Sequence, residues 1–380
     1  MIRTNLWPAI LCMTLMSFAL ISSEFMPVAL LTPIGAELGM TEGQTGQAIA
    51  FSGLFAVLTS LFSNSVFART DRRIVVMFYT GVMVVSGLAV TFAPNAVVFM
   101  IGRALIGMAI GGFFSISTAI AARIASGDDL VRFLTWIQAG SALAAVLAQP
   151  VGSFLGGMIG WRGAFFTVVP IGIVALFLQA KVLPKVPSAQ AVPVSRTLGM
   201  LAKRRFAVGM MAMTMFFVGQ FALSTYLRPY LEGVTHLGIG SLSLTLFILG
   251  LSGLAGTLLV GHAIRRFQHG LLIGAPVGLV VISVALIGLG EYFMPVALLL
   301  ILWGFLTSPI PAVWGDWMTR VIPDDLEPGG AMFVALIQTA ITCGAFVGGA
   351  LFDTLGWQTT FAFAGAAFAA SALVAACMQR

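Results

Sequence analysis

The stretch WPAILCMTLMSFALISSEFMPVALLTP, residues 7–33, decides what kind of protein this chain is. It has the length and apolar composition of a membrane-spanning helix, since about 20 apolar residues cross the hydrocarbon core of a bilayer. Glu24 is its one charged residue. A carboxylate in hydrocarbon costs at least ~2.5 kcal/mol on insertion scales, so it persists where it faces a protein interior or a water-filled path. Glu24 is therefore the first candidate for a proton or substrate site.

The composition of the whole chain indicates an integral membrane protein. Of its 380 residues, 59% are hydrophobic and only 8% are charged, whereas about 25% are charged in a soluble domain. No segment shows the alternation of an outer-membrane strand, so we expect helices. The net charge of +6 does not indicate nucleic-acid binding, because the basic residues lie in short connections between apolar runs.

Apolar runs predict an all-α membrane fold with twelve transmembrane helices in two six-helix halves. The spans are expected at residues 7–33, 46–67, 74–93, 96–119, 133–155, 163–182, 207–230, 241–262, 271–289, 293–317, 330–352 and 358–377. One basic, proline-containing connection divides the chain. The expected units are an N-terminal half at residues 1–183, a linker at 184–206 and a C-terminal half at 207–380.

The basic residues predict the orientation. Twelve spans place both termini on one side, and that side receives nearly all lysines and arginines outside the spans, including those of the linker. Only Arg162 and Arg228 fall on the other side. By the positive-inside rule, the termini and the linker are cytoplasmic, as in a bacterial inner-membrane protein.

A weak repeat supports two related halves. Gly160-Trp161 followed by Phe165 recurs as Gly356-Trp357 followed by Phe361, at an offset of 196 residues. That offset is about half of the chain.

Glu24 and Arg103 are predicted to lie at the same depth. Each is nine or ten residues from the outer end of its span, or ~15 Å at 1.5 Å per residue. An ion pair is expected if the two spans are neighbours, and small rearrangements would then load or release a proton. The alternative is a static buried pair that holds the helices in register.

Prolines and glycines mark expected hinges. Pro27 frees a backbone carbonyl one turn before it, beside Glu24. Pro150 and Gly152 lie in a glycine-rich span, where small residues also permit simple close packing.

Few polar or amphipathic side chains remain inside the spans to line a cavity. Amides and aromatic rings suit a neutral, hydrogen-bonding ligand, although any one of them can be a packing residue. The candidates are Gln138, Gln220, Tyr226, Trp303 and Gln338. Neither a phosphate-binding loop, a metal-spaced cluster nor a nucleophile elbow is present in the sequence, so we expect no enzyme, no metal and no cofactor.

Several motifs resemble those of the major facilitator superfamily, and in particular its drug and metabolite proton antiporters. GRALIG at 102–107 resembles the motif whose buried arginine takes part in proton coupling, and QPVGSFLGG at 149–157 resembles the exporters' antiporter motif. The run at 24–31 resembles the sugar and nucleoside efflux branch. Within that branch, the purine ribonucleoside efflux permeases are most similar at TDRR 70–73, GQFA 219–222, TYLRP 225–229, IQ 337–338 and TCGA 342–345.

By this resemblance, the cytoplasmic loop after the second span carries the family's charged motif, here Arg69, Asp71, Arg72 and Arg73. In the family, this motif forms charge pairs on the cytoplasmic face. Ala68 stands where the family usually has an aspartate, and Asp71 is a possible substitute.

These observations favour a proton-coupled exporter that works by alternating access, with purine ribonucleosides as the first choice of solute. Sugar or multidrug export, a passive channel, and a membrane sensor are the alternatives. The expected partners are the solute, protons and the lipid bilayer, and we expect a monomer.

Overall fold

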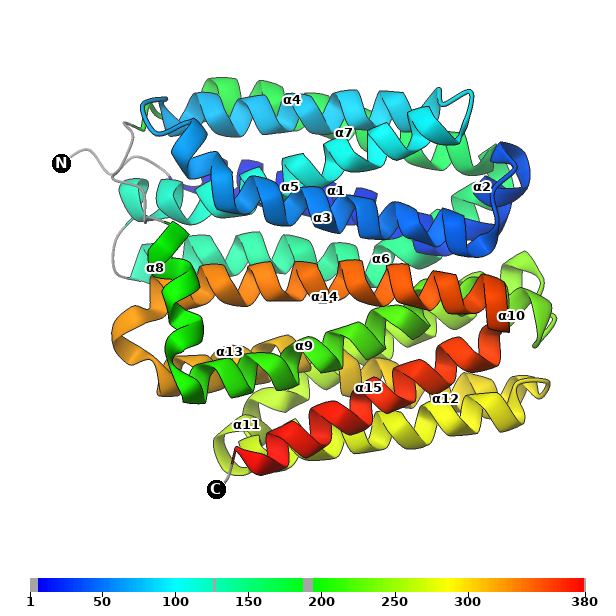
Figure 1. Ribbon diagram of the computed structural model, residues 1–380. Coiled ribbons are helices and arrows are strands. Elements are labelled where there is room, and N and C mark those ends of the chain that lie inside the picture. Colours follow the sequence, from blue (N-terminus) through cyan, green and yellow to red (C-terminus); the bar gives the residue numbers. More distant parts are fainter. Residues whose placement is uncertain (1–5, 126–127, 187–193, 379–380) are drawn as a thin grey trace.

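The computed structural model describes residues 6–125, 128–186 and 194–378, which form helices and short connections without a strand among them (Figure 1). The helices up to the linker are α1 (Trp7–Phe25), η1 (Met26–Leu30), α2 (Leu31–Leu38), α3 (Glu42–Val66), α4 (Arg72–Thr91), α5 (Ala96–Ile124), α6 (Asp128–Phe166) and α7 (Val168–Val182). Those that follow are α8 (Val194–Gly199), η2 (Met200–Ala202), α9 (Arg204–Thr225), α10 (Leu227–Gly233), α11 (Ile239–Leu289), α12 (Phe293–Thr307), α13 (Ile310–Val321), η3 (Pro323–Asp325), α14 (Leu326–Leu355) and α15 (Trp357–Cys377).

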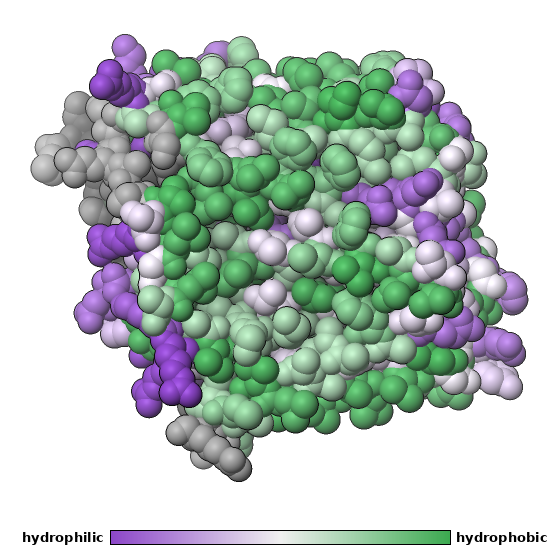
Figure 2. All heavy atoms as spheres, viewed as in Figure 1, coloured by the Kyte–Doolittle hydropathy of each residue, from purple (hydrophilic) through white to green (hydrophobic). Residues whose placement is uncertain are grey.

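Eleven of the described helical segments are long and apolar enough to cross a membrane. One of them, Arg132–Val182, has 51 residues, far more than the about 20 that a crossing needs. This segment turns at Gly160 and makes two crossings, so the twelve predicted crossings are present. Figure 2 shows apolar residues over the middle of the molecule and hydrophilic residues at its two ends, as a bilayer requires.

The turn at Gly160 has an equivalent in the second half. Gly160 has φ 74° and ψ 164°, and Gly356 has φ 85° and ψ 170°, a region that glycine enters without strain. The tryptophan after each glycine then packs edge-on against a phenylalanine one turn later: Trp161 on Phe165 and Trp357 on Phe361. The sequence repeat therefore marks a structural repeat.

Two hydrophobic cores form on either side of the linker. One is built from α1 to α7, and the other from α9 to α15 with a few residues of η1 and α3 packed against it. The linker is anchored at its second end, where Lys203 and Arg196 bind Asp325. These hydrogen bonds, from Lys203 first, hold the pKa of Asp325 below its usual range. Residues 187–193 of the linker lie outside the described residues, and the unit boundaries at 183 and 206 stay predictions.

Glycines let helices of one half approach closely. A side chain at Gly107 or Gly111 of α5 would collide with the backbone carbonyls of Ser52 or Ala56 of α3. This contact brings α3 against the helix that carries Arg103, as small-residue stripes do in membrane bundles.

Candidate transport site

The first span breaks beside Glu24. The α-helical hydrogen bonds of α1 end at Phe25, and η1 continues as a tighter 3-10 turn that contains Pro27. Proline has no N–H, so it cannot bond to Ser23 O as in an α-helix or to Glu24 O as in a 3-10 helix. These two buried carbonyls thus lack the main-chain donor that residue 27 would otherwise supply.

Arg103 of α5 binds these two carbonyls. Its guanidinium donates to Ser23 O at 2.8 Å and to Glu24 O at 3.1 Å. It also donates to Ala48 O at 3.3 Å and to Ser52 Oγ at 3.1 Å, both on α3. Arg103 is completely buried. It therefore joins the break in α1 to α3, and satisfies groups that would otherwise be costly to bury.

The carboxylate of Glu24 points the other way, toward the second half. It is 2% exposed, and its Oε1 accepts a hydrogen bond from Gln338 Nε2 of α14 at 3.5 Å. No ion pair joins Glu24 to Arg103, although both residues belong to the described part of the chain. The two spans are neighbours, as expected, but the arginine holds the main chain of residue 24 and leaves its side chain at the contact between the halves.

The predicted cavity residues lie in different surroundings. Gln138 of α6 is exposed, and Gln220 of α9 is half-buried with an Oε1 atom that has no hydrogen-bond partner. Tyr226 is buried, donates to Ala345 O at 2.7 Å and stacks on Phe352. Trp303 is buried edge-on against Phe368 within the core of the second half. The contacts of Tyr226 and Trp303 are thus packing contacts, whereas Gln220 and Gln338 keep polar atoms available.

An aromatic pair beside Glu24 was not predicted from the sequence. Phe25 of α1 and Phe221 of α9 stack with ring centroids 6.0 Å apart and an interplanar angle of 18°. The 196-residue offset between the glycine turns also relates Glu24-Phe25 to Gln220-Phe221. Applying that offset to the first span would have identified this pair.

The predicted hinge in α6 faces both halves. Pro150 frees the carbonyl of Val146, and this carbonyl lies against Gly250 of α11. A side chain at Gly152 would press on Met26 of η1, at 3.0 Å. The irregular part of α6 therefore packs between the break in the first span and the second half.

The halves also contact each other at the end of the molecule that carries α2 and α10 (Figure 1). Asp353 of α14 accepts from Thr41 Oγ1 at 2.5 Å and from Gly43 N at 2.9 Å, so it caps the N-terminus of α3 from the other half. Arg228 of α10 donates to Ala29 O of η1 and pairs with Glu232 at 2.7 Å. We call Asp353, Thr41 and Gly43 the clasp.

The predicted loop motif of Arg69, Asp71, Arg72 and Arg73 contacts the linker. Asp71 caps α4 by accepting from Arg73 N at 2.8 Å, and it also accepts from Val186 N at 3.1 Å. Arg73 donates to Ala180 O, Arg72 is buried, and Arg69 is exposed. The described bonds of Asp71 therefore fasten the first half to the linker rather than to the second half.

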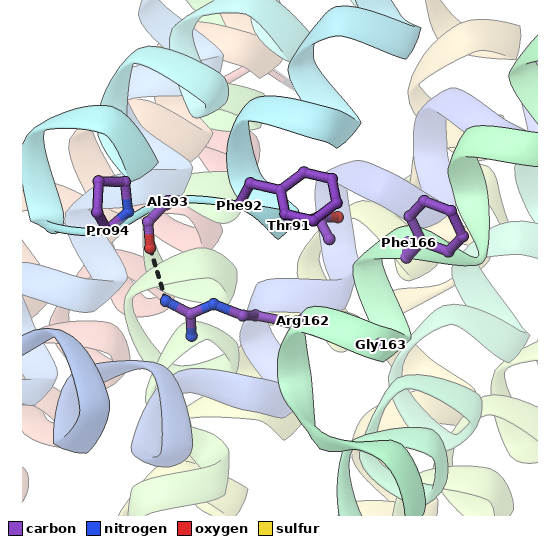
Figure 3. Close-up of a pocket in the computed structure, with 7 residues that line it drawn as sticks. All are labelled: Thr91, Phe92, Ala93, Pro94, Arg162, Gly163 and Phe166. Atoms are coloured by element: carbon purple, nitrogen blue, oxygen red, sulfur yellow. Dashed lines mark hydrogen bonds between the residues drawn. The ribbon is translucent and has the colours of Figure 1, made fainter.

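An open hollow of about 470 Å³ lies in the first half, between the connection from α4 to α5 and the end of α6 (Figure 3). It is bounded by Phe92, Pro94 and Phe166, and Arg162 reaches into it to donate to Ala93 O at 2.6 Å. Glu37 also binds Arg162 and accepts from Trp161 Nε1. This hollow is a surface feature of one half and lacks the contact between halves that a transport site needs.

The chain belongs to the Major Facilitator Superfamily, whose family model matches residues 9–327. Among curated proteins it is 44% identical to the transcription regulatory protein OpdE of Pseudomonas aeruginosa, over 96% of this chain and 92% of that one. It is 34% identical to the purine ribonucleoside efflux pump NepI of Salmonella paratyphi A, over 98% of this chain and 94% of that one.

Solved structures agree on the fold. A D-xylose-proton symporter superposes with a TM-score of 0.77 at 15% identity, covering 99% of this chain and 97% of the other. The human organic anion transporter MFSD10 gives 0.69 at 15% identity, with 98% and 100% covered. The protein is a multi-pass membrane transporter that carries small molecules, and it is not an enzyme.

Proposed function

We propose that this protein is a proton-coupled exporter of purine ribonucleosides, such as inosine and guanosine, from the bacterial cytoplasm. The observation that carries the proposal is the position of Glu24. Its carboxylate is buried at the contact between the halves, while Arg103 fixes the backbone behind it. A titratable group at that contact changes its surroundings whenever the halves move apart.

The coupling follows from this geometry. When the halves separate at Glu24, the carboxylate loses Gln338 and meets water, so it can exchange a proton with that side of the membrane. When they close, the carboxylate is again held against Gln338 and shielded from water, so proton exchange stops. A membrane potential supplies ~2.3 kcal/mol per charge per 100 mV, which is enough to make one coupled proton useful.

The choice of solute rests on the relative named as a nucleoside efflux pump and on the amide side chains of α9 and α14. Gln220 and Gln338 offer amides that can pair with the edge of a purine. Sugar or multidrug export by the same mechanism is the alternative, since amides also pair with hydroxyl groups. We place the linker and both termini in the cytoplasm, in the inner membrane, and expect a monomer built from the two halves.

A sensor role is the second candidate, because the relative at 44% identity is named a transcription regulatory protein. An exporter can itself change transcription by lowering the concentration of an inducer. The two functions differ in one measurable respect, because a sensor binds its ligand without net transport. A passive channel would instead give a flux that does not saturate.

Uptake into inverted membrane vesicles tests the proposal. Such vesicles expose the cytoplasmic face of the membrane to the medium. An exporter therefore accumulates its substrate in the lumen when the lumen is made more acidic than the medium. We expect saturable accumulation of radiolabelled inosine that collapses when the gradient is removed. Binding without accumulation would support the sensor, and accumulation of sugars or cationic dyes alone would overturn the choice of solute.

A further inference from the structure

The stacked pair of Phe25 and Phe221 has two properties that set it apart. Each ring comes from the equivalent position of its half, at the shared offset of 196 residues. Among the described residues, it is also the aromatic contact that joins the two halves, since the other close ring pairs lie within one half. The pair therefore lies at the contact between the halves, where side chains from corresponding positions of the two halves meet.

A polar residue with unused bonding capacity directly precedes each ring in the sequence. Gln220 precedes Phe221 in α9, and its buried Oε1 accepts no hydrogen bond. Glu24 precedes Phe25 in α1, and its single described side-chain bond, to Gln338, is at the 3.5 Å limit. A buried acceptor without a donor is uncommon and costly. The Oε1 atom of Gln220 therefore favours a ligand that donates an N–H group.

We propose that Phe25 and Phe221 determine specificity by stacking on the flat base of the substrate, which takes the place of their mutual contact, while Gln220 accepts an N–H from the base edge. This inference rests on the proposed nucleoside export and deepens it. With centroids 6.0 Å apart, the rings leave no space for a third ring between them. The base can enter only as the two halves separate.

This arrangement links recognition to movement. Separation of the halves costs the Phe25–Phe221 contact, and a flat base restores stacking on the exposed ring faces. A sugar has no such face, so it stabilises the separated state less. A ligand shifts a conformational equilibrium only by its differential affinity for the two states, and here stacking supplies that difference.

Equilibrium binding to the purified full-length protein tests the inference, with radiolabelled inosine as the probe and ribose as the ring-free comparison. We expect Phe25→Leu and Phe221→Leu each to weaken inosine binding about 10-fold, as loss of a base-stacking ring does in other proteins. Phe25→Tyr and Phe221→Tyr should bind like wild type, because they keep the ring. Ribose binding should be the same in all of these variants.

Phe216→Leu is the matched control, because Phe216 lies on the same helix but packs on Phe368 inside the second half. It should leave inosine affinity unchanged. Leucine variants at 25 and 221 that keep wild-type affinity, with only a lower melting temperature, would show that the pair merely packs. Failure of the wild type to bind any nucleoside would instead overturn the proposed function. Binding of another flat heteroaromatic compound, with the same dependence on both rings, would then still support the stacking role.

Discussion

At the scale of single residues, Glu24 and Arg103 have separate tasks. The arginine is committed to backbone carbonyls, and the carboxylate is left free to change its surroundings. Replacement of either residue should therefore have a distinct outcome.

Glu24→Gln keeps the shape of the side chain but removes its titration. We expect gradient-driven accumulation to be abolished, while substrate binding and passive exchange persist. Uptake with and without a pH gradient measures this, and Glu37→Gln serves as the control, since Glu37 is exposed. Gradient-driven uptake at the wild-type level in Glu24→Gln would remove the carboxylate from the coupling mechanism.

Arg103→Ala should be more damaging than Arg103→Lys. Alanine removes the Arg103 bonds to the carbonyls of Ser23 and Glu24, and a buried group left unsatisfied costs roughly 1–3 kcal/mol. Lysine keeps the charge and some of the bonds but lacks the guanidinium fork. Thermal unfolding and transport together measure the difference, and equal, mild losses in both variants would favour a simple packing role.

At the scale of elements, the break in the first span explains why Arg103 is needed. Pro27→Ala would restore an N–H that can reach Ser23 O within α1. We therefore expect Pro27→Ala to recover part of the thermal stability that Arg103→Ala loses, because the helix then satisfies its own carbonyl. Independent, additive effects in the double mutant would contradict this link.

The second prediction at this scale concerns the clasp. Asp353→Ala removes the cap of α3, and a lost cap costs about 1 kcal/mol, or roughly a fivefold shift in population toward opening of the halves at this end. Spin labels at the exposed positions Gln44 and Thr354 would report the separation of α3 and α14. The matched control is Asp325→Ala at the other end of the molecule. An unchanged distance distribution in Asp353→Ala would show that the clasp does not hold this end closed.

At the scale of the whole molecule, the fold was predictable because each span needs its own apolar run, and those runs were visible. The geometry of the site was less accessible. The sequence shows that Pro27 frees a carbonyl, but the guanidinium that takes it comes from a helix about 80 positions away. The clasp joins residues more than 300 positions apart, and no local pattern signals it.

Orientation is the prediction for the whole molecule. A single cysteine in place of Ser188, which lies outside the described residues, should resist an impermeant thiol reagent in intact cells and react in inverted vesicles. Cys12, Cys343 and Cys377 must first be replaced, because Cys343 and Cys377 are exposed. Labelling from outside the cell would reverse the assignment.

The stacked phenylalanines also bear on how such a chain can be assembled. A residue that meets its own counterpart is the mark of an isologous interface, the kind that joins identical subunits around a two-fold axis. The contact between Phe25 and Phe221 has this form within one polypeptide. Two separately expressed six-helix fragments would thus meet through a surface already shaped for self-association, and co-expression of residues 1–186 with residues 194–380 should reconstitute a working transporter.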